Sequence, residues 1–280
     1  MTVRDPRLTL ARPDLAAASL EGLVRAERFA PTQVLTCAAP VAAIRRAPDA
    51  AAEQMDQLLF GEIFEVADEA DGWAWGQARR DGYVGFVERS ILAALRPAPT
   101  HRVSALRAYA FAAPSIKARP IGLYSMNALV AIEAHEGRFA RVAGSGWFVE
   151  GQLSAVGLAE TDLAGVAERF LGAAYQWGGR ESLGLDCSGL VQQAHYACGL
   201  SCPRDTDQQV GLGRAIEAAD LGRGDLVFWR GHVGLMLDEA RLLHANAHHM
   251  AVTIEPLAEA VRRIAAADSG TPTAYRRVIG

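Results

Sequence analysis

The chain has 280 residues, a net charge of −4 and a hydrophobic share of 50%. This length is enough for two or three modules, because single hydrophobic cores stop growing at about 250–300 residues. The negative balance offers no basic field for nucleic acid or for an anionic membrane, so we expect neither as a partner. No apolar run approaches the ~18 residues of a membrane span, and segment 1–14 mixes charges with prolines. We therefore expect no signal peptide and a cytoplasmic protein.

The chain contains the cysteines Cys37, Cys187, Cys198 and Cys202. They are too few for a disulfide scaffold in a chain of this length. Cys198 and Cys202 could form half of a metal site, but no second Cys/His pair has partner spacing. We expect no metal and no cofactor, and a set of reduced cysteines of which one has a special role.

The N-terminal part is predicted to be a lead-in segment followed by β-structure. Residues 1–30 are irregular apart from one helical stretch, 14–26, for which Asp14 is a plausible N-cap. Short strands follow from residue 34 onward. Asp-Gly pairs at 71–72 and 81–82 indicate turns between them.

The β-structure shows one pattern twice: a strand, an acidic turn, an aromatic strand and a closing Phe-Val-Glu. FEVADEADGWAWGQ and GYVGFVE form the first pass, and VAIEAHEGRFARV and GSGWFVE form the second. Because repeats of this size indicate a duplicated module, we predict two SH3-like β-barrels, at 31–98 and 99–155, joined near Pro97-Ala98-Pro99. A single β-domain of about ten strands is the alternative.

After Ser154 the pattern changes to mixed helix and strand. Apolar spacing predicts helices over 161–173, with Thr161 as N-cap, and over 186–200. The strands GDLVFW, HVGLML and RLLHANA follow. Helices followed by an antiparallel sheet are typical of the α+β class, which we predict for 156–280.

Cys187 is the candidate nucleophile. It lies in the first turn of the second helix, on the apolar face of that helix. The positive end of the helix dipole favours a thiolate, and the glycines of the preceding loop let backbone approach a ligand. The alternative is a buried, inert cysteine.

Two histidines are candidates for the base that serves Cys187. His195 lies on the same helix about 12 Å further along the axis, which is out of reach. His232 and His244 lie in neighbouring apolar strands, and Asp238 is midway between them in the sequence. A hairpin that turns at Asp238 would place the two histidines across from each other on one face. A thiol facing two such histidines is the arrangement of nucleophile, base and orienting residue, although two independent strand histidines remain the alternative. The weaker candidates lie in the β-modules or in a loop: His101, His135, His248 and His249.

These motifs resemble the NlpC/P60 group of papain-like cysteine peptidases. The resemblance rests on YQWGGRESLGLDCSGLVQ, PRDTDQQ, GDLVFWRGHVGLML and LLHANAHHMAV, and extends from Phe170 to the end of the chain. It implies Cys187 as nucleophile, His232 as base and His244 as the residue that orients it. The upstream half resembles, more loosely, the bacterial SH3-like (SH3b) modules of γ-D-glutamyl-L-diamino acid endopeptidases of the dipeptidyl-peptidase VI type.

The resemblance also implies a substrate. Proteins of that type cut murein peptides with a free N-terminal L-Ala after γ-D-Glu, so the expected partner is L-Ala-γ-D-Glu-diamino acid. Asp186 and Ser188 would hold its amino end, and a carboxylate suits an ammonium partner. Tyr175 would lie near the oxyanion, while Tyr83 and Glu62 would close the pocket.

Other functions fit the same residues. An amidase or acyltransferase of this fold would use Cys187 and His232 on a different amide, and a non-catalytic wall-peptide binder would need only the barrels. A Cys-His-acid set in another order is disfavoured, because no acidic residue replaces His244 on its strand. Arg204 and Gln208 fit the family pattern as loop braces. The sequence leaves open the diamino acid, the oligomeric state and whether the substrate is recycled peptide or intact wall.

Overall fold

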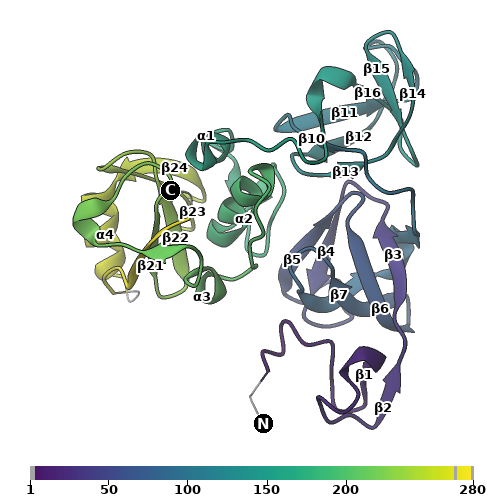
Figure 1. Cartoon of the computed structure of the whole chain (residues 1–280), viewed down its shortest axis with the longest axis horizontal. Coiled ribbons are helices and arrows are strands. Elements are labelled where there is room, and N and C mark those ends of the chain that lie inside the picture. The colour runs from purple at the N-terminus through teal and green to yellow at the C-terminus, as the bar shows by residue number, and fades with distance from the viewer. Residues whose placement is uncertain (1–3, 268–269, 279–280) are drawn as a thin grey trace. The chain divides into compact units, whose positions relative to one another are not determined.

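The computed structural model describes residues 4–267 and 270–278. Contacts divide the chain into two compact units, Met1–Val156 and Gly157–Gly280. The boundary predicted at residue 156 lies beside this division. Figure 1 follows the chain from the purple N-terminal strands to the yellow C-terminal elements. Within the described residues, none of the helices has both the length and the apolar character that a membrane crossing needs.

The N-terminal segment forms strands, and the helix predicted over 14–26 is wrong. The elements here are β1 (Leu15–Ala17), the 3-10 turn η1 (Ala18–Leu20) and β2 (Arg28–Ala30), with β1 and β2 paired in parallel. Leu15 is fully buried and packs against Trp75 of the first barrel. Burial against the barrel therefore outweighs helix propensity, which is a weak preference. Asp14 caps no helix, and its carboxylate instead accepts from Arg12 at 2.9 Å.

The first barrel is one antiparallel sheet with the strand order β5-β4-β8-β7-β6-β3-β9. Its elements are β3 (Gln33–Cys37), β4 (Val41–Arg45), β5 (Gln54–Leu59), β6 (Ile63–Ala70), β7 (Trp73–Ala78), β8 (Val84–Glu88), η2 (Arg89–Ile91) and β9 (Leu92–Ala94). The predicted Asp-Gly turns connect β6 to β7 and β7 to β8. Asp71 and Gly72 have φ of 50° and 82°, the left-handed conformation that a tight hairpin turn requires.

The second barrel consists of two sheets, with the strand orders β13-β10-β17 and β12-β11-β16-β15-β14. Its elements are β10 (His101–Val103), β11 (Arg107–Phe111), β12 (Pro120–Ser125), β13 (Leu129–Val130), β14 (Ile132–Glu136), β15 (Phe139–Val142), β16 (Trp147–Val149), η3 (Glu150–Gln152) and β17 (Leu153–Ala155). Both barrels end with a strand, a 3-10 turn and a short strand, so the repeated Phe-Val-Glu segment has the same local structure twice. The sheets are consistent with SH3-like barrels, while Leu59 and Phe60 of the first barrel share a buried cluster with the second; the boundary between them at 98 and 99 stays a prediction.

The C-terminal unit has a mixed sheet with the strand order β19-β18-β24-β23-β22-β21-β25-β20. Its strands are β18 (Ala174–Tyr175), β19 (Gly184–Leu185), β20 (Arg214–Ala215), β21 (Leu226–Trp229), β22 (His232–Met236), β23 (Arg241–Asn246), β24 (Ala251–Pro256) and β25 (Ala274–Arg277). The predicted strands GDLVFW, HVGLML and RLLHANA correspond to β21, β22 and β23. The predicted α+β class is confirmed.

Four α-helices accompany this sheet in the described part of the unit: α1 (Leu163–Glu168), α2 (Cys187–Ala197), α3 (Thr206–Gln209) and α4 (Leu257–Ala265). The helix predicted over 161–173 is shorter than expected, and its N-cap position is Asp162 rather than Thr161. α2 contacts β22 and β23, while α4 contacts β23 and β24. Ala260 and Ile264 of α4 are buried with Met236 of the sheet.

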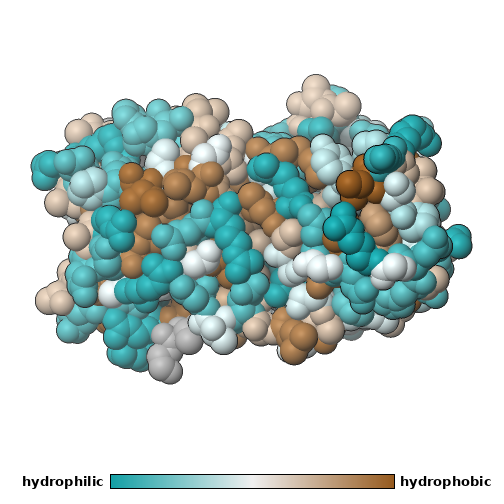
Figure 2. Space-filling view, turned by 90° about the horizontal axis from the view of Figure 1, so that it is seen from above, coloured by the Kyte–Doolittle hydropathy of each residue, from teal (hydrophilic) through white to brown (hydrophobic). Residues whose placement is uncertain are grey.

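Figure 2 shows hydrophilic and hydrophobic residues interspersed over one face of the molecule, with the hydrophobic ones in separate groups. The large apolar side chains exposed in the C-terminal unit include Leu171, Trp177, Leu183 and Met250. Scattered exposure of this kind is ordinary in folded proteins.

Candidate active site

The site begins at the N-terminus of α2. Asp186 occupies the N-cap position with an extended backbone, and its side chain accepts a hydrogen bond from the Gly189 amide at 2.8 Å. Cys187 is therefore the first residue of the helix, as predicted. A Cβ added to Gly189 would lie 2.2 Å from the carbonyl oxygen of Gly179, so only glycine lets the preceding loop lie on this turn. The nucleophile candidate is thus positioned by backbone packing.

A buried ion pair braces the same turn. Arg204 is 1% exposed and donates to both carboxylate oxygens of Asp186, at 2.9 and 2.6 Å. Arg204 also donates to the Ser188 hydroxyl at 2.7 Å, and the Gly178 amide donates to Asp186 at 2.8 Å. Asp186 and Ser188 were predicted to hold the amino end of a substrate. That role stays a prediction, and these internal donors compete with it.

The two candidate histidines meet on the sheet. His232 Nε2 lies 2.8 Å from His244 Nδ1. The predicted common face is present, but the histidines are not directly opposite. The pairs Leu235–Leu243 and Met236–Leu242 are centred on residue 239 rather than on Asp238, so His244 faces position 234 and His232 is its diagonal neighbour. Diagonal neighbours on one face are within reach of long side chains.

The chain of contacts continues beyond His244 to two residues outside the predicted site, Glu255 and Arg263. His244 Nε2 lies 2.7 Å from a carboxylate oxygen of Glu255 on β24. Glu255 forms an ion pair with Arg263 of α4. The side chain of His244 has no exposed surface, and that of Glu255 is 12% exposed. Only the pairing of β23 with β24 brings Glu255 here, so no local motif could have indicated it.

The Cys187 thiol lies against the start of β22. The backbone amides of Val233 and Ser188 form hydrogen bonds with its sulfur, which favour the thiolate, but burial outweighs them and raises the pKa of Cys187 to about 12. The Asp186 carboxylate raises this pKa further. The helix-dipole argument for a depressed pKa is therefore wrong for this state of the protein, because burial penalises the charged sulfur more than the helix end favours it.

The histidines are neutral for the same reason. Burial lowers the pKa of His232 to about 3, and the neighbouring His244 and Arg263 lower it further. Burial likewise lowers the pKa of His244 to about 3, with Arg263 adding to the effect. At neutral pH the site therefore holds a protonated thiol beside two neutral imidazoles.

Tyr175 lines a cavity of about 300 Å³ together with His232, His244 and Arg263. Burial raises the pKa of Tyr175, and the neighbouring Cys187 and Asp186 contribute in the same direction. Its hydroxyl group thus stays protonated and can act as a hydrogen-bond donor near Cys187. The cavity is large enough for a small substrate group beside the imidazole of His232.

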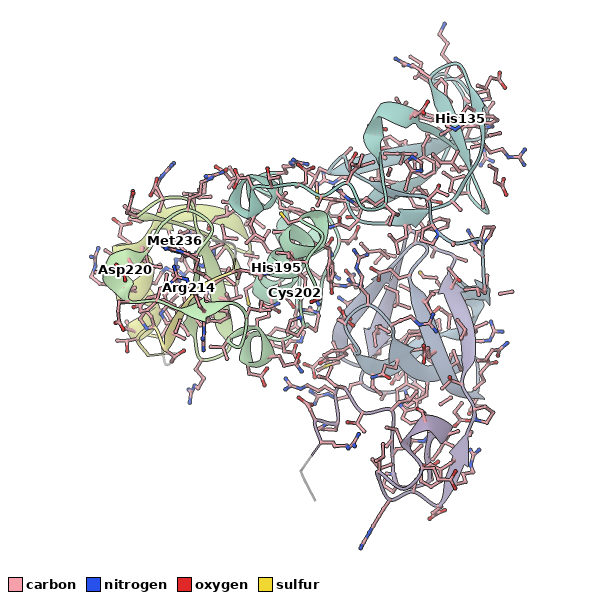
Figure 3. All side chains as sticks on the ribbon, in the orientation of Figure 1. His135, His195, Cys202, Arg214, Asp220 and Met236 are labelled. Carbon is pink, nitrogen blue, oxygen red and sulfur yellow. The ribbon has the colours of Figure 1, made fainter. Side chains whose placement is uncertain are left out.

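His195 and His135 lie away from this arrangement, whereas His248 lines the same cavity as His232 and His244. His195 is buried in α2, where its Nδ1 lies 2.7 Å from the Val191 carbonyl oxygen (Figure 3). His135 is exposed in β14 and lies 3.4 Å from the Glu150 carboxylate. Neither contacts the pair formed by His232 and His244 in the described contacts.

Tyr83 and Glu62 belong to the N-terminal unit. Tyr83 is 1% exposed and is part of the core of the first barrel. Glu62 is equally buried, accepts from the Leu59 amide at 3.0 Å and pairs with Arg80 at 2.8 Å. Their predicted part in closing the substrate pocket stays a prediction.

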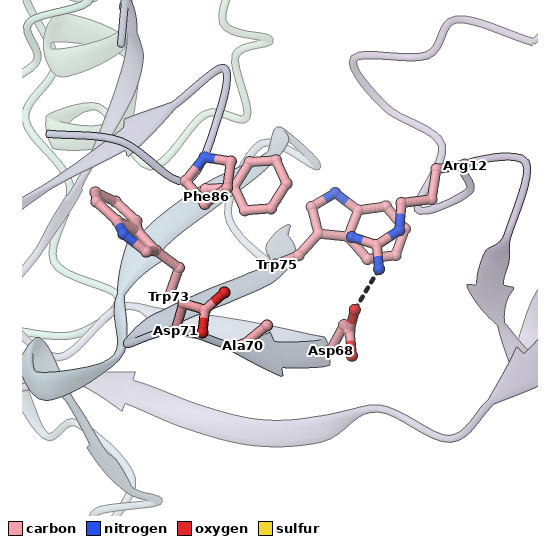
Figure 4. Close-up of a pocket in the computed structure, with 8 residues that line it drawn as sticks. Arg12, Asp68, Ala70, Asp71, Trp73, Trp75 and Phe86 are labelled. Atoms are coloured by element: carbon pink, nitrogen blue, oxygen red, sulfur yellow. Dashed lines mark hydrogen bonds and ion pairs between the residues drawn. The ribbon is translucent and has the colours of Figure 1, made fainter. Parts of the chain in front are cut away.

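A second pocket lies on the first barrel (Figure 4), and none of the predicted site residues lines it. Trp73, Trp75 and Phe86 form its aromatic walls. Arg12 lies over the Trp75 ring at 4.5 Å and forms an ion pair with Asp68. The N-terminal segment thus contributes one side of this pocket.

The C-terminal unit has a papain-like fold, in which a helix that begins with a cysteine packs on the antiparallel strands β22 and β23, which carry the two histidines. Residues 172–264 match the NlpC/P60 family, and residues 44–92 match the bacterial dipeptidyl-peptidase SH3 domain. The chain is 31% identical over 227 residues to the γ-D-glutamyl-L-lysine dipeptidyl-peptidase of Bacillus subtilis (strain 168), covering 73% of this chain and 76% of that protein. The chain belongs to the NlpC/P60 family.

Two further relatives agree. A probable endopeptidase NlpC homolog of Haemophilus influenzae is 38% identical over 100 residues, covering 35% of this chain and 54% of that protein. The crystal structure of an NlpC/P60 family protein from Bacillus cereus ATCC 10987 superimposes with a TM-score of 0.76 at 19% identity, covering 89% of this chain and 100% of that chain. The latter likeness shows the shared fold.

Proposed function

We propose that this protein is a cysteine peptidase that hydrolyses bacterial cell-wall peptides between γ-D-glutamate and the diamino acid. Cys187 is the nucleophile, His232 the base and His244 the residue that orients it. The observation that carries the proposal is the 2.8 Å contact between His232 and His244. Val233, the residue after His232, donates a backbone hydrogen bond to the Cys187 sulfur. The substrate class is supported by the B. subtilis relative, whose name is γ-D-glutamyl-L-lysine dipeptidyl-peptidase.

The reaction starts from the neutral pair. His232 contacts His244 through Nε2, so its other ring nitrogen, Nδ1, is the base. As the Cys187 sulfur attacks the γ-carbonyl carbon, its proton moves to His232 Nδ1, and neither charged form has to exist alone in the buried site. The backbone amide of Cys187, at the start of α2, and the protonated Tyr175 hydroxyl donate to the oxyanion.

The second half of the reaction clears the acyl group. Protonated His232 gives its proton to the leaving amine of the diamino acid, which leaves a thioester on Cys187. Neutral His232 then removes a proton from water, and the resulting hydroxide attacks the thioester. Collapse of that intermediate releases the γ-D-glutamate carboxylate and returns the proton to the sulfur.

Recognition of a free N-terminal L-Ala is part of the proposal. Asp186 and Ser188 flank the nucleophile, and Arg204 offsets the charge of Asp186. An ammonium group therefore meets a carboxylate whose charge is already balanced. To bind Asp186 it would have to displace an internal donor, such as the Ser188 hydroxyl that donates to Asp186 Oδ1 at 3.2 Å. The parts assigned to Tyr83 and Glu62 are open to direct test by Tyr83→Phe and Glu62→Gln.

Mass spectrometry of a defined peptide tests the proposal. We would incubate L-Ala-γ-D-Glu-diaminopimelate, plain and N-acetylated, with wild type, Cys187→Ala and the control Cys198→Ala. We expect L-Ala-D-Glu from the plain peptide with wild type and Cys198→Ala, and no product with Cys187→Ala. Cleavage of both peptides would remove the amino-end requirement. Absence of cleavage by folded, reduced wild type, both of this peptide and of the same peptide with L-lysine as the diamino acid, would contradict the peptidase itself.

A further inference from the structure

Three neighbouring strands carry a diagonal row of polar side chains. His232 lies on β22, His244 on β23 and Glu255 on β24. His244 pairs with Thr253, and Glu255 pairs with Leu242, so Glu255 is the diagonal neighbour of His244 on the same face. The step from β22 to β23 has the same geometry. The row therefore has two direct contacts, one between His232 and His244 and one between His244 and Glu255.

The charge of Glu255 determines the direction of the hydrogen bonds along this row. Arg263 forms an ion pair with Glu255, which is therefore a carboxylate and can only accept. His244 must then donate from Nε2 across the 2.7 Å contact, which leaves its Nδ1 unprotonated. An unprotonated Nδ1 accepts across the 2.8 Å contact from His232 Nε2–H. The lone pair of His232 is thereby left on Nδ1.

We infer that Glu255, held by Arg263, is a positioning residue that fixes the tautomers of both histidines and makes His232 Nδ1 the base. This inference rests on the proposed function, in which His232 takes the proton of Cys187. Without the carboxylate, His244 could present either nitrogen to His232, and the fraction of molecules with the correct lone pair would fall. Orienting the base through a third group is the recurring logic of such sites.

Glu255 also acts on the imidazolium that forms during the reaction. The charged groups that act on His232 come from four elements: His244 of β23, Glu255 of β24, Arg263 of α4 and the α2 cap Asp186. Glu255 and Asp186 favour protonated His232, whereas Arg263 and His244 oppose it. His249 and Arg263 act on His244. Removal of the Glu255 charge should therefore leave only Asp186 to offset Arg263 and His244, and should make the proton harder for His232 to accept.

The test compares Glu255→Gln with Glu259→Gln, the same change at an exposed position of α4. We expect Glu255→Gln to lower kcat by about 10- to 100-fold with KM nearly unchanged, and to shift the acid limb of the kcat–pH profile to lower pH. Glu259→Gln should match wild type. Equal kcat values and pH profiles for wild type and Glu255→Gln would overturn the inference.

Nitrogen NMR of the histidine side chains gives a readout that needs no substrate and no variant. In the wild-type protein at pH 7 we expect His244 as the Nε2–H tautomer and His232 also as the Nε2–H tautomer. Observation of His244 with its proton on Nδ1 would overturn the inference, even if Glu255→Gln did not fold. A wild type with these tautomers but without peptidase activity would support the positioning of the histidines and contradict only the proposed reaction.

Discussion

Arg204 donates to both carboxylate oxygens of Asp186, at 2.9 and 2.6 Å, and Asp186 is the N-cap of the helix that begins with Cys187. The nucleophile candidate is thus braced by an ion pair from a segment 18 residues further along the chain. Because the pair is buried, removal of one partner leaves an uncompensated charge, and the effect on stability should be large.

Replacement of Arg204 tests this brace. We expect Arg204→Met to lower the free energy of unfolding by about 3–5 kcal/mol, measured by urea titration. The control is Arg223→Met, which removes an exposed arginine paired with Asp162 at 2.7 Å and should cost less than about 1 kcal/mol. Equal losses for the two variants would show that Asp186 does not depend on its buried partner.

The ionisation of the nucleophile can be followed by alkylation. Burial raises the pKa of Cys187 to about 12, so the free enzyme should hold a neutral thiol at pH 7. The rate of reaction with iodoacetamide, measured on the peptide that contains Cys187, should therefore rise about tenfold per pH unit up to pH ~9. A rate that is already constant between pH ~6 and ~8 would indicate a preformed thiolate–imidazolium pair and exclude the neutral starting state.

The two buried histidines should make stability depend on pH. The folded pKa of His232 and that of His244 are both lowered to about 3, so between pH ~3 and ~6.5 the unfolded chain binds protons that the folded protein does not. Their contribution is intact above pH ~6.5 and is lost as the pH falls below it. Each histidine should add a slope of about 1.4 kcal/mol per pH unit to the free energy of unfolding.

The variant that isolates this slope is His244→Gln, with the exposed His248→Gln as control. Between pH ~4.5 and ~6, we expect His244→Gln to reduce the slope of the free energy of unfolding against pH by about 1.4 kcal/mol per pH unit, which corresponds to one proton. This change in slope does not depend on the effect of the variant on absolute stability. If the slope were the same in His244→Gln as in wild type, the lowered pKa of His244 would be contradicted.

The two histidines should also differ in their effect on catalysis. His232→Ala removes the base itself and should lower kcat by about 10²- to 10⁴-fold, whereas His244→Ala removes only its orientation and should cost less. Added imidazole should restore part of the activity of His232→Ala. The measurement is kcat on the plain tripeptide. An inactive His244→Ala beside an active His232→Ala would require exchange of the two roles.

Much of the site could be predicted because its signals are local. The apolar spacing of residues 186–200 placed Cys187 in the first turn of a helix, whereas the Asp186 cap emerged only from the structure. The even separation of His232 and His244 placed both on one face of a hairpin, since side chains alternate along a strand. The exact centre of the turn was missed by one residue, which changed opposite histidines into diagonal ones.

The rest depends on tertiary structure. The lead-in segment forms β1 because Leu15 packs against Trp75, which lies 60 positions further along the sequence. Glu255 reaches His244 only through the register of β24, and the charge balance at Cys187 follows from its burial. None of these features has a sequence motif of its own, because each depends on which elements become neighbours.

The diagonal row of His232, His244 and Glu255 makes enzymatic activity a stricter reporter of correct strand assembly than stability is. A slip of two residues between β23 and β24 would keep every apolar side chain on its proper face, since alternation repeats every two residues. Such a molecule could bury nearly the same surface and melt at nearly the same temperature. It would nevertheless separate Glu255 from His244, and its kcat would fall by about the same 10- to 100-fold that we expect for Glu255→Gln.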